Sequence, residues 1–265
     1  MAVDGEVTAI DSAGFGPITI TQSVTITSPA GVEAGIQAAA GGNAITINAR
    51  DSNVTLQGLT LEGAGVAFNG IVFNMGDSLT VTDCVVQNFL YAGGATGNGI
   101  LMQPPSGPIN PISFVIANTN VSNNGNIGIY YFPPLNGSAT ATVAIDHVVA
   151  TNNVAVGISI NTVNGGGATT VAVSNSVVSN NSGTGIYFEN ASSALQGSID
   201  NSTISGNLID GVDAETSSDL EIGRSVITYN GTGILNNTSP NRVYSYQDNR
   251  ITRMVQILVV RMVRL

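Results

Sequence analysis

Three carboxylates stand at matched positions after two Gly-Ile or Gly-Val dipeptides. Glu189 lies four residues after Gly185, whereas Asp213 and Glu215 lie two and four residues after Gly211. Neighbouring carboxylates separate their pKa values, so that one stays protonated as an acid while another is charged as a base or nucleophile. Glycoside hydrolysis needs such a pair. We therefore expect these three residues to be catalytic, with no cofactor required.

Residues suited to sugars occupy the equivalent positions of the preceding repeats. Tyr130 and Tyr187 offer flat rings on which a sugar can lie, and Ser159 and Asn161 supply a hydroxyl and an amide. Side chains alternate along a strand, so residues two and four after each glycine point outward together. We expect these four residues to bind the substrate.

The same acids allow two other interpretations. Asp213 and Glu215, with help from Asp210 or Asn161, carry the oxygen ligands that Ca²⁺ prefers, although no metal site is assigned. Alternatively they are solvated side chains of an acidic protein, because charges normally lie on the outer faces of strands.

The single histidine, His147, and the single cysteine, Cys84, have structural explanations. In the aligned repeats His147 shares a column with Gly58, Asp83, Asn118, Asn175, Asn201 and Arg224. Gly, Asn, Asp and His are the types that adopt positive φ most readily, so this column predicts a tight turn. Cys84 belongs to the next column, which holds small residues: Thr119, Val148, Ser176, Ser202 and Ser225. We expect neither residue to be catalytic.

An internal repeat positions all of these candidates. Gly-Ile, once Gly-Val, recurs at spacings of 29, 29, 29, 28, 26 and 22 residues, beginning at Gly70, Gly99, Gly128, Gly157, Gly185, Gly211 and Gly233. Each repeat holds three short runs of alternating apolar residues, which is typical of strands. We predict an all-β fold, a right-handed parallel β-helix of about eight to nine coils with three short strands per coil. The apolar residue after each glycine should stack into a core ladder.

The repeat pattern defines one β-helix domain over residues 1–241, with the first coils in 1–69 and regular coils in 70–241. Residues 242–265 depart from it, because RITRMVQILVVRMVRL has four arginines and neither Gly nor Asn. This tail is either a basic amphipathic cap or the product of a one-nucleotide frameshift after Ile251. No capping helix precedes the first coil, so end-to-end self-association is also expected.

Composition limits the partners. Seventeen Asp and Glu stand against seven Arg, lysine is absent, and the net charge is -10. This balance argues against nucleic acid and anionic membranes. The polar residues are mainly Asn, Ser, Thr and Gly, which suits an extracellular or cell-surface protein, although the residues after Met1 do not form a signal peptide.

The repeats resemble those of the pectate-lyase-like superfamily of right-handed parallel β-helices, over roughly residues 15–241 and including an asparagine-rich turn ladder. Ala144-Ile145-Asp146-His147 matches three of the four residues of a Trp-Ile-Asp-His stretch in pectate lyases. The Arg-x-Pro-x-x-Arg segment of that family is absent, as are the Gly-His-Gly and Arg-Ile-Lys motifs of polygalacturonases. The resemblance therefore implies the fold and leaves the activity open.

We predict a secreted or surface protein that binds polysaccharide and, if it is an enzyme, hydrolyses it. Hydrolysis is favoured over a lyase reaction because the predicted outer face has no Arg, Lys or His to abstract a sugar proton. The alternative is a non-enzymatic structural, adhesive or self-assembling solenoid. The two differ in whether Glu189, Asp213 and Glu215 converge in one concave patch.

Overall fold

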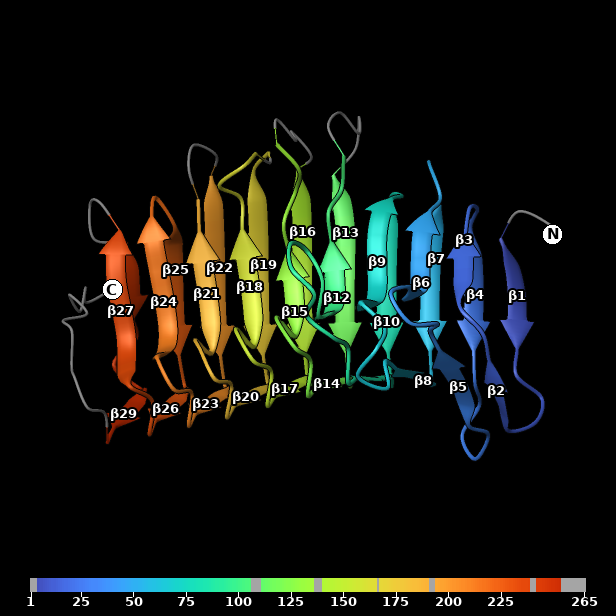
Figure 1. Cartoon of the computed structure of the whole chain (residues 1–265). Helices are drawn as coiled ribbons and strands as arrows, with labels where there is room; N and C mark the ends of the chain where they lie inside the picture. The colour runs from blue at the N-terminus through green and yellow to red at the C-terminus, as the bar shows by residue number, and fades with distance from the viewer. Residues whose placement is uncertain are drawn as a thin grey trace.

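The chain winds into a solenoid of short parallel strands (Figure 1). The structure is a computed structural model that describes residues 4–105, 111–135, 140–165, 167–190, 194–238 and 242–253. These residues contain no helix, and so none that could cross a membrane.

The strands form three sheets, here called A, B and C. Sheet A has ten strands in the spatial order β1 (Gly5–Thr8), β4 (Val24–Thr27), β7 (Asn53–Gln57), β10 (Ser78–Thr82), β13 (Ile112–Ala117), β16 (Ala141–Asp146), β19 (Thr169–Ser174), β22 (Leu195–Asp200), β25 (Asp219–Gly223) and β28 (Val243–Ser245). Sheet B has ten, in the order β2 (Ala13–Phe15), β5 (Ala34–Gln37), β8 (Leu59–Glu62), β11 (Val85–Gln87), β14 (Asn120–Ser122), β17 (Val149–Thr151), β20 (Val177–Ser179), β23 (Thr203–Ser205), β26 (Val226–Thr228) and β29 (Arg250–Thr252). Sheet C has nine, in the order β3 (Ile18–Ile20), β6 (Asn43–Asn48), β9 (Asn69–Met75), β12 (Asn98–Met102), β15 (Ile129–Tyr131), β18 (Ile158–Asn161), β21 (Ile186–Glu189), β24 (Asp210–Thr216) and β27 (Thr232–Thr238).

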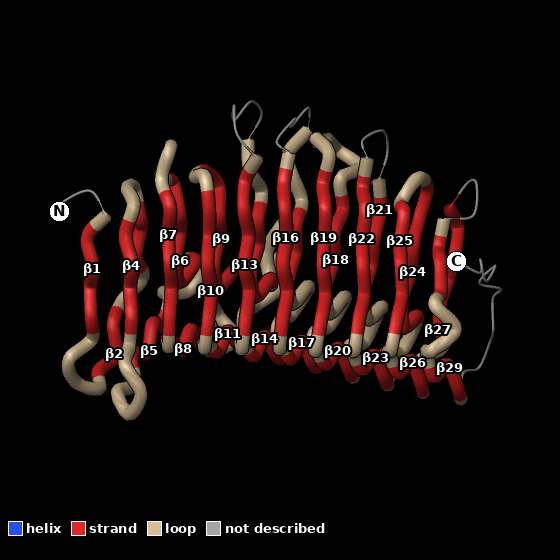
Figure 2. The backbone as a smooth tube through the Cα atoms, turned by 180° about the vertical axis from the view of Figure 1, so that it is seen from behind, coloured by secondary structure: helices blue, strands red, loops and turns tan. Residues whose placement is uncertain are grey.

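Each coil crosses sheets B, C and A in turn, and neighbouring coils pair in parallel. Sheet C lies in front of sheet A in Figure 1, and the short strands of sheet B close the lower edge. Figure 2 shows the same arrangement from behind, with sheet A toward the viewer. The predicted all-β solenoid with three strands per coil is thus confirmed.

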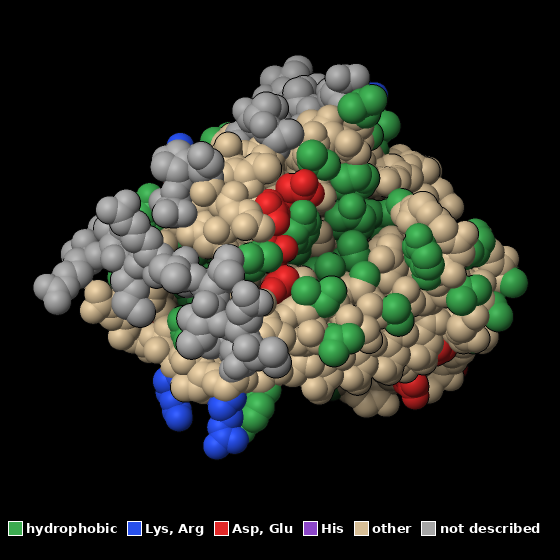
Figure 3. All heavy atoms as spheres, turned by 60° about the vertical axis from the view of Figure 1, so that its left-hand side comes forward, with side chains coloured by type: hydrophobic (Ala, Val, Ile, Leu, Met, Phe, Trp, Pro, Cys, Tyr) green, Lys and Arg blue, Asp and Glu red, His purple; other side chains and the backbone are tan. Residues whose placement is uncertain are grey.

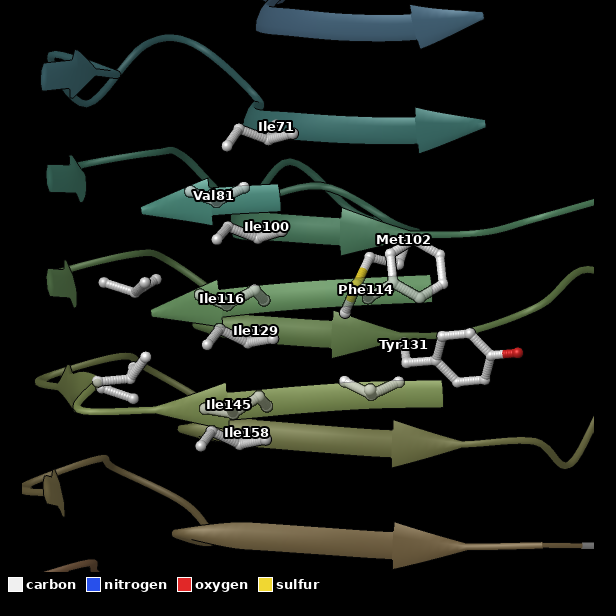
Figure 4. Close-up of a cluster of buried hydrophobic side chains, with 14 of the residues drawn as sticks. Ile71, Val81, Ile100, Met102, Phe114, Ile116, Ile129, Tyr131, Ile145 and Ile158 are labelled. Carbon is white, nitrogen blue, oxygen red and sulfur yellow. The ribbon is translucent and has the colours of Figure 1, made fainter. Parts of the chain in front are cut away.

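The residue after each repeated glycine forms the core ladder that the repeat predicted. Ile100 pairs with Ile71 on one side and with Ile129 on the other, and all three are fully buried. Figure 4 shows these side chains stacked opposite residues of sheet A such as Ile116. Burial of one such side chain contributes about 1.5–3 kcal/mol, so the ladder stabilises every coil.

His147 is a turn residue, as its column predicted. It lies between β16 and β17 with a φ of 52° and an exposed side chain. Positive φ is shared by the rest of the column, namely Gly58, Asp83, Asn118, Asn175, Asn201 and Arg224. Its Nδ1 atom lies 2.7 Å from Oδ2 of Asp146, whose pKa is lowered to about 2 by hydrogen bonds from Ser174, Asn175 and His147. The pair belongs to a surface hydrogen-bond network of the turn.

The column of Cys84 also has the expected structural role. Cys84 is fully buried, and burial raises the pKa of its thiol to about 11, which disfavours a nucleophilic thiolate. In the following coils a hydroxyl accepts a hydrogen bond from the main-chain N–H of the coil before. Oγ of Ser176 accepts from Val148 at 3.1 Å, and Oγ of Ser202 accepts from Ser176 at 3.1 Å. These bonds tie neighbouring coils together at the turn.

The asparagine-rich turn column also links neighbouring coils, because Nδ2 of Asn201 donates to Oδ1 of Asn175 at 2.7 Å. A second, buried asparagine ladder lies in another column. Its members are Asn124, Asn153, Asn181, Asn207 and Asn230, all of them buried. Oδ1 of Asn181 accepts two bonds from Asn153, from the main-chain N–H at 2.9 Å and from Nδ2 at 3.0 Å. This ladder also explains the repeated glycine, because a Cβ atom on Gly157 would lie 2.7 Å from Nδ2 of Asn181.

The solenoid continues past the expected boundary at residue 241. Strands β28 and β29 add to sheets A and B, because the sequence there still supplies core residues. Val243 is buried opposite Leu220, and Ile251 packs against the core opposite Ile227. The whole tail, residues 242–265, was expected to be a basic amphipathic cap or a frameshift product. Its first part, up to residue 253, forms strands and turns instead of a helix, and residues 254–265 lie outside the described residues.

Candidate functional site

The candidate residues lie on the outer face of sheet C, in two neighbouring columns. In the first column Tyr130 pairs with Ser159, Ser159 with Tyr187, and Tyr187 with Asp213. Successive members are separated by one strand spacing of about 4.8 Å, so the column runs along the solenoid axis. The second column lies two residues further along each strand.

The second column contains Asn161, Glu189, Glu215 and Asn237. Asn161 pairs with Glu189 across β18 and β21, and Glu215 pairs with Asn237 across β24 and β27. Because Glu189 and Glu215 each stand two residues beyond the paired Tyr187 and Asp213, all three predicted carboxylates face the same patch. The structure therefore brings together the acids that the sequence singled out.

Asp213 is the least accessible of these acids. It is 8% exposed, and its Oδ1 atom is buried without a hydrogen bond to any described residue. Burial, followed by the charges of Glu215, Asp210 and Glu189, raises the pKa of its carboxyl group to about 7. A carboxylic acid with this pKa holds its proton to near-neutral pH and can act as a general acid.

Glu189 is held in place by two donors. Nδ2 of Asn161 donates to its Oε2 atom at 2.6 Å, and the hydroxyl of Tyr187 is also hydrogen-bonded to it. Burial and this bond, with the charges of the three carboxylates, raise the pKa of Tyr187, so the tyrosine stays a donor. Glu189 is thus oriented as a base or nucleophile.

Glu215 lies between the acid and the edge of the patch. Its Oε1 atom accepts a hydrogen bond from Nδ2 of Asn237 at 2.7 Å. Its charge is the second cause, after burial, of the raised pKa of Asp213. Among the neighbouring charges, that of Glu215, two positions along the same strand, therefore contributes most to the raised pKa of Asp213.

An aromatic surface adjoins the acids on the side of the N-terminal coils. The rings of Tyr130 and Phe132 are stacked, with centroids 4.9 Å apart and an angle of 18° between planes. Burial and the charge of Glu189 raise the pKa of Tyr130 to about 12, so it too remains a neutral phenol. We did not select Phe132 as a binding residue, although two-residue alternation places it on the same face as Tyr130.

Some residues of the outer column, two positions after each repeated glycine, are less accessible to solvent than the alternation of side chains along a strand implies. Ser159 is 2% exposed, and Val72 and Leu101 on the earlier coils are 4% and 1% exposed. Ser159 therefore offers almost no surface to a ligand, in contrast to our expectation. Neighbouring side chains and segments shield these positions, an effect that the alternation of one strand does not reveal.

Asp210 does not share the face of the other acids. It lies two residues before the core residue Val212, is 4% exposed, and is hydrogen-bonded to Thr184 and Thr232. Across the described residues, no three His, Cys, Asp or Glu side chains form a group that could hold a metal ion. A calcium site at Asp213, Glu215 and Asp210 stays a prediction, and the arrangement fits acid–base chemistry better.

Acidic and hydrophobic side chains adjoin on the surface of the solenoid. Figure 3 shows a short row of acidic side chains in a hollow, with hydrophobic side chains beside it. The described strands of sheet C contain no Arg, Lys or His. The chemistry available here is therefore that of paired carboxylates next to aromatic rings.

Comparisons with known proteins agree with this architecture. No protein-family model and no curated protein matches the sequence. Among solved structures the chain is similar to pectate lyase Pel9A, with 14% identity over 95% of this chain and 68% of that one and a TM-score of 0.65. It is also similar to the A-module of mannuronan C-5 epimerase AlgE4 from Azotobacter vinelandii, with 15% identity, coverage of 96% and 86%, and a TM-score of 0.51.

At such low identity the likeness establishes the fold. The chain has the fold of a right-handed parallel β-helix, as its repeats indicated.

Proposed function

We propose that this protein is a secreted or surface β-helix that binds a neutral or weakly charged polysaccharide on the outer face of sheet C and hydrolyses it. The observation that carries the proposal is the buried carboxyl group of Asp213, whose pKa is raised to about 7, beside the hydrogen-bonded carboxylate of Glu189. Two carboxyl groups with different environments and different protonation are what glycoside hydrolysis requires.

In this mechanism Asp213 is the general acid. Its proton passes to the glycosidic oxygen as the bond to the anomeric carbon breaks. Glu189 either takes a proton from the attacking water, or attacks the anomeric carbon itself to form a glycosyl ester, which is then cleaved by water that gives its proton back to Asp213. In both cases the products are two shorter saccharides, and one molecule of water is consumed.

The substrate class follows from the charges and rings around the acids. The carboxylates of Glu189 and Glu215, with no cation in the described strands of sheet C, repel a polyanion, whereas Tyr130, Phe132 and Tyr187 present rings to the apolar face of a sugar. Both similar solved structures are named as enzymes of polysaccharides, pectate and mannuronan. We take from them the polymeric nature of the ligand and not its charge.

The test is incubation of the protein with neutral polysaccharides such as arabinoxylan, mixed-linkage β-glucan and galactomannan. Hydrolysis creates new reducing ends without unsaturated products, whereas elimination creates both. Absence of new ends on all substrates, together with absence of binding, would contradict the proposal. The regular ladders of the solenoid would then point to the structural or adhesive alternative.

A further inference from the structure

A groove lies on the other broad side of the solenoid, on the outer face of sheet A. It is a cavity of about 330 Å³ formed by four successive strands, β19, β22, β25 and β28, which face the viewer in Figure 2. Six outward side chains line it: Thr170, Gln196, Ser198, Asp219, Glu221 and Tyr244. Its volume falls at the lower end of the range of ligand pockets, about 300–1,000 Å³.

The residue sizes in one register column produce this shape. Ala172 pairs with Ser198, Ser198 with Glu221, and Glu221 with Tyr244, so small side chains give way to large ones along the axis. The floor includes Gly197, where a Cβ atom would lie 2.8 Å from the ring of Phe188. Gly197 faces the core between the outward residues Gln196 and Ser198, so the floor at this point is main chain. Tyr244 forms the wall at one end.

The charged groups of the groove already have partners. Asp219 forms an ion pair with Arg242, with a distance of 3.5 Å between Oδ2 and Nη1. Oε2 of Glu221 accepts a hydrogen bond from the hydroxyl of Tyr246 at 2.8 Å. These contacts hold both carboxylates in fixed orientations and partly compensate their charge. The groove thus offers oriented acceptors, an amide, two hydroxyls and an aromatic ring.

We propose that this groove is a non-catalytic binding site for a short segment of a neutral saccharide. Sugar hydroxyls would donate to Asp219 and Glu221 and exchange hydrogen bonds with Gln196, while a ring face packs on Tyr244. The site is separate from the acids of sheet C, which lie on the opposite broad side of the solenoid. It does not depend on hydrolysis at sheet C.

The experiment is isothermal titration of the full chain with xylohexaose, cellohexaose and mannohexaose. A background that carries Glu189→Gln, Tyr130→Ala and Tyr187→Ala prevents cleavage and weakens binding at sheet C. We expect at least one of the three probes still to bind in this background. Ser198→Trp, which fills the floor from the outside, should abolish that binding, and Tyr244→Ala should weaken it about tenfold.

Two further variants separate loss of binding from loss of folding. Tyr244→Phe keeps the ring and should bind within about threefold of the background. Tyr229→Ala removes an exposed tyrosine elsewhere, next to Arg253, and should have no effect. The proposal is overturned if no probe binds the background, or if Ser198→Trp and Tyr244→Ala leave its affinity unchanged. Because binding alone is measured, these results are independent of whether the protein releases reducing ends.

Discussion

Tyr187 and Asp213 are direct register partners on adjacent coils of sheet C, yet the hydroxyl of Tyr187 is bonded to Glu189 instead. Oδ1 of Asp213 is left buried and makes no hydrogen bond to the described residues. A buried polar atom without a partner costs folding free energy. The unpartnered Oδ1 atom thus destabilises the fold at the position where the proposed mechanism needs a protonated acid.

Replacement of Asp213 by Asn should therefore stabilise the fold at high pH. The pKa of a free Asp is about 3.9, and in the fold it is about 7, so ionisation above pH 4 increasingly favours the unfolded chain. Three pKa units correspond to at most about 4 kcal/mol. We expect Asp213→Asn to raise the free energy of unfolding at pH 8 by up to that amount and to change it little at pH 4.

Urea unfolding at the two pH values measures this difference. Asp219→Asn is the matched control, because Asp219 is paired with Arg242 and should show no gain at pH 8. If Asp213→Asn changed the free energy of unfolding equally at pH 4 and pH 8, ionisation of Asp213 would not destabilise the folded protein.

The pH dependence of hydrolysis should report the same group. As a general acid Asp213 must be protonated, so kcat/KM should fall as the pH rises through about 7. Glu215→Gln removes a nearby negative charge and should move this fall to lower pH. Glu33→Gln, at an exposed position outside both sites, serves as the control. A profile that Glu215→Gln and Glu33→Gln shift equally would argue against electrostatic tuning by Glu215.

The asparagine ladder should contribute strongly to stability. Asn181 donates to Oδ1 of Asn207 at 2.9 Å and to the carbonyl of Ala150 at 3.2 Å, in addition to accepting from Asn153. Asn181→Ala leaves several buried groups without partners, each costing about 1–3 kcal/mol. Thermal unfolding should show a loss of several kcal/mol, against less than about 1 kcal/mol for Asn201→Gly at an exposed turn. Similar losses in both variants would refute a special role for the ladder.

His147 should be replaceable without loss of function. With a φ of 52° and an exposed side chain, it can become Asn with little change in stability or activity. His147→Val places a β-branched residue in the same conformation and should destabilise the protein by about 1–2 kcal/mol. Unfolding and activity measured on both variants distinguish these roles. A large loss of activity in a stable His147→Asn variant would show that the histidine takes part in the reaction.

The features that repeat along the chain could be predicted from the sequence. The residue after each glycine forms the core ladder, and the column of His147 forms the turn, because a solenoid translates a sequence period directly into a spatial stack. The three acids meet on one face for the same reason. Glu189, Asp213 and Glu215 share their spacing from a repeated glycine.

Features that depend on packing between segments could not be predicted in this way. The burial of Ser159 and Asp213 is set by neighbours on other coils and loops, which the alternation within a strand does not describe. The buried asparagine ladder could not be identified from the sequence, because the column of His147 and the column of Asn153 are both rich in Asn. Only the inward direction of Asn153 and its neighbours distinguishes the ladder from the exposed column.

The most direct test of the central claim is release of reducing ends from one neutral polysaccharide by three forms of the protein. The account predicts release by the wild type and by Asp11→Asn, a change at an exposed aspartate outside both sites, and a loss of at least about a hundredfold in Asp213→Asn. Binding of the polysaccharide by Asp213→Asn should persist. Equal release by Asp213→Asn and the wild type would contradict the assignment of Asp213 as the acid, and with it the proposed mechanism.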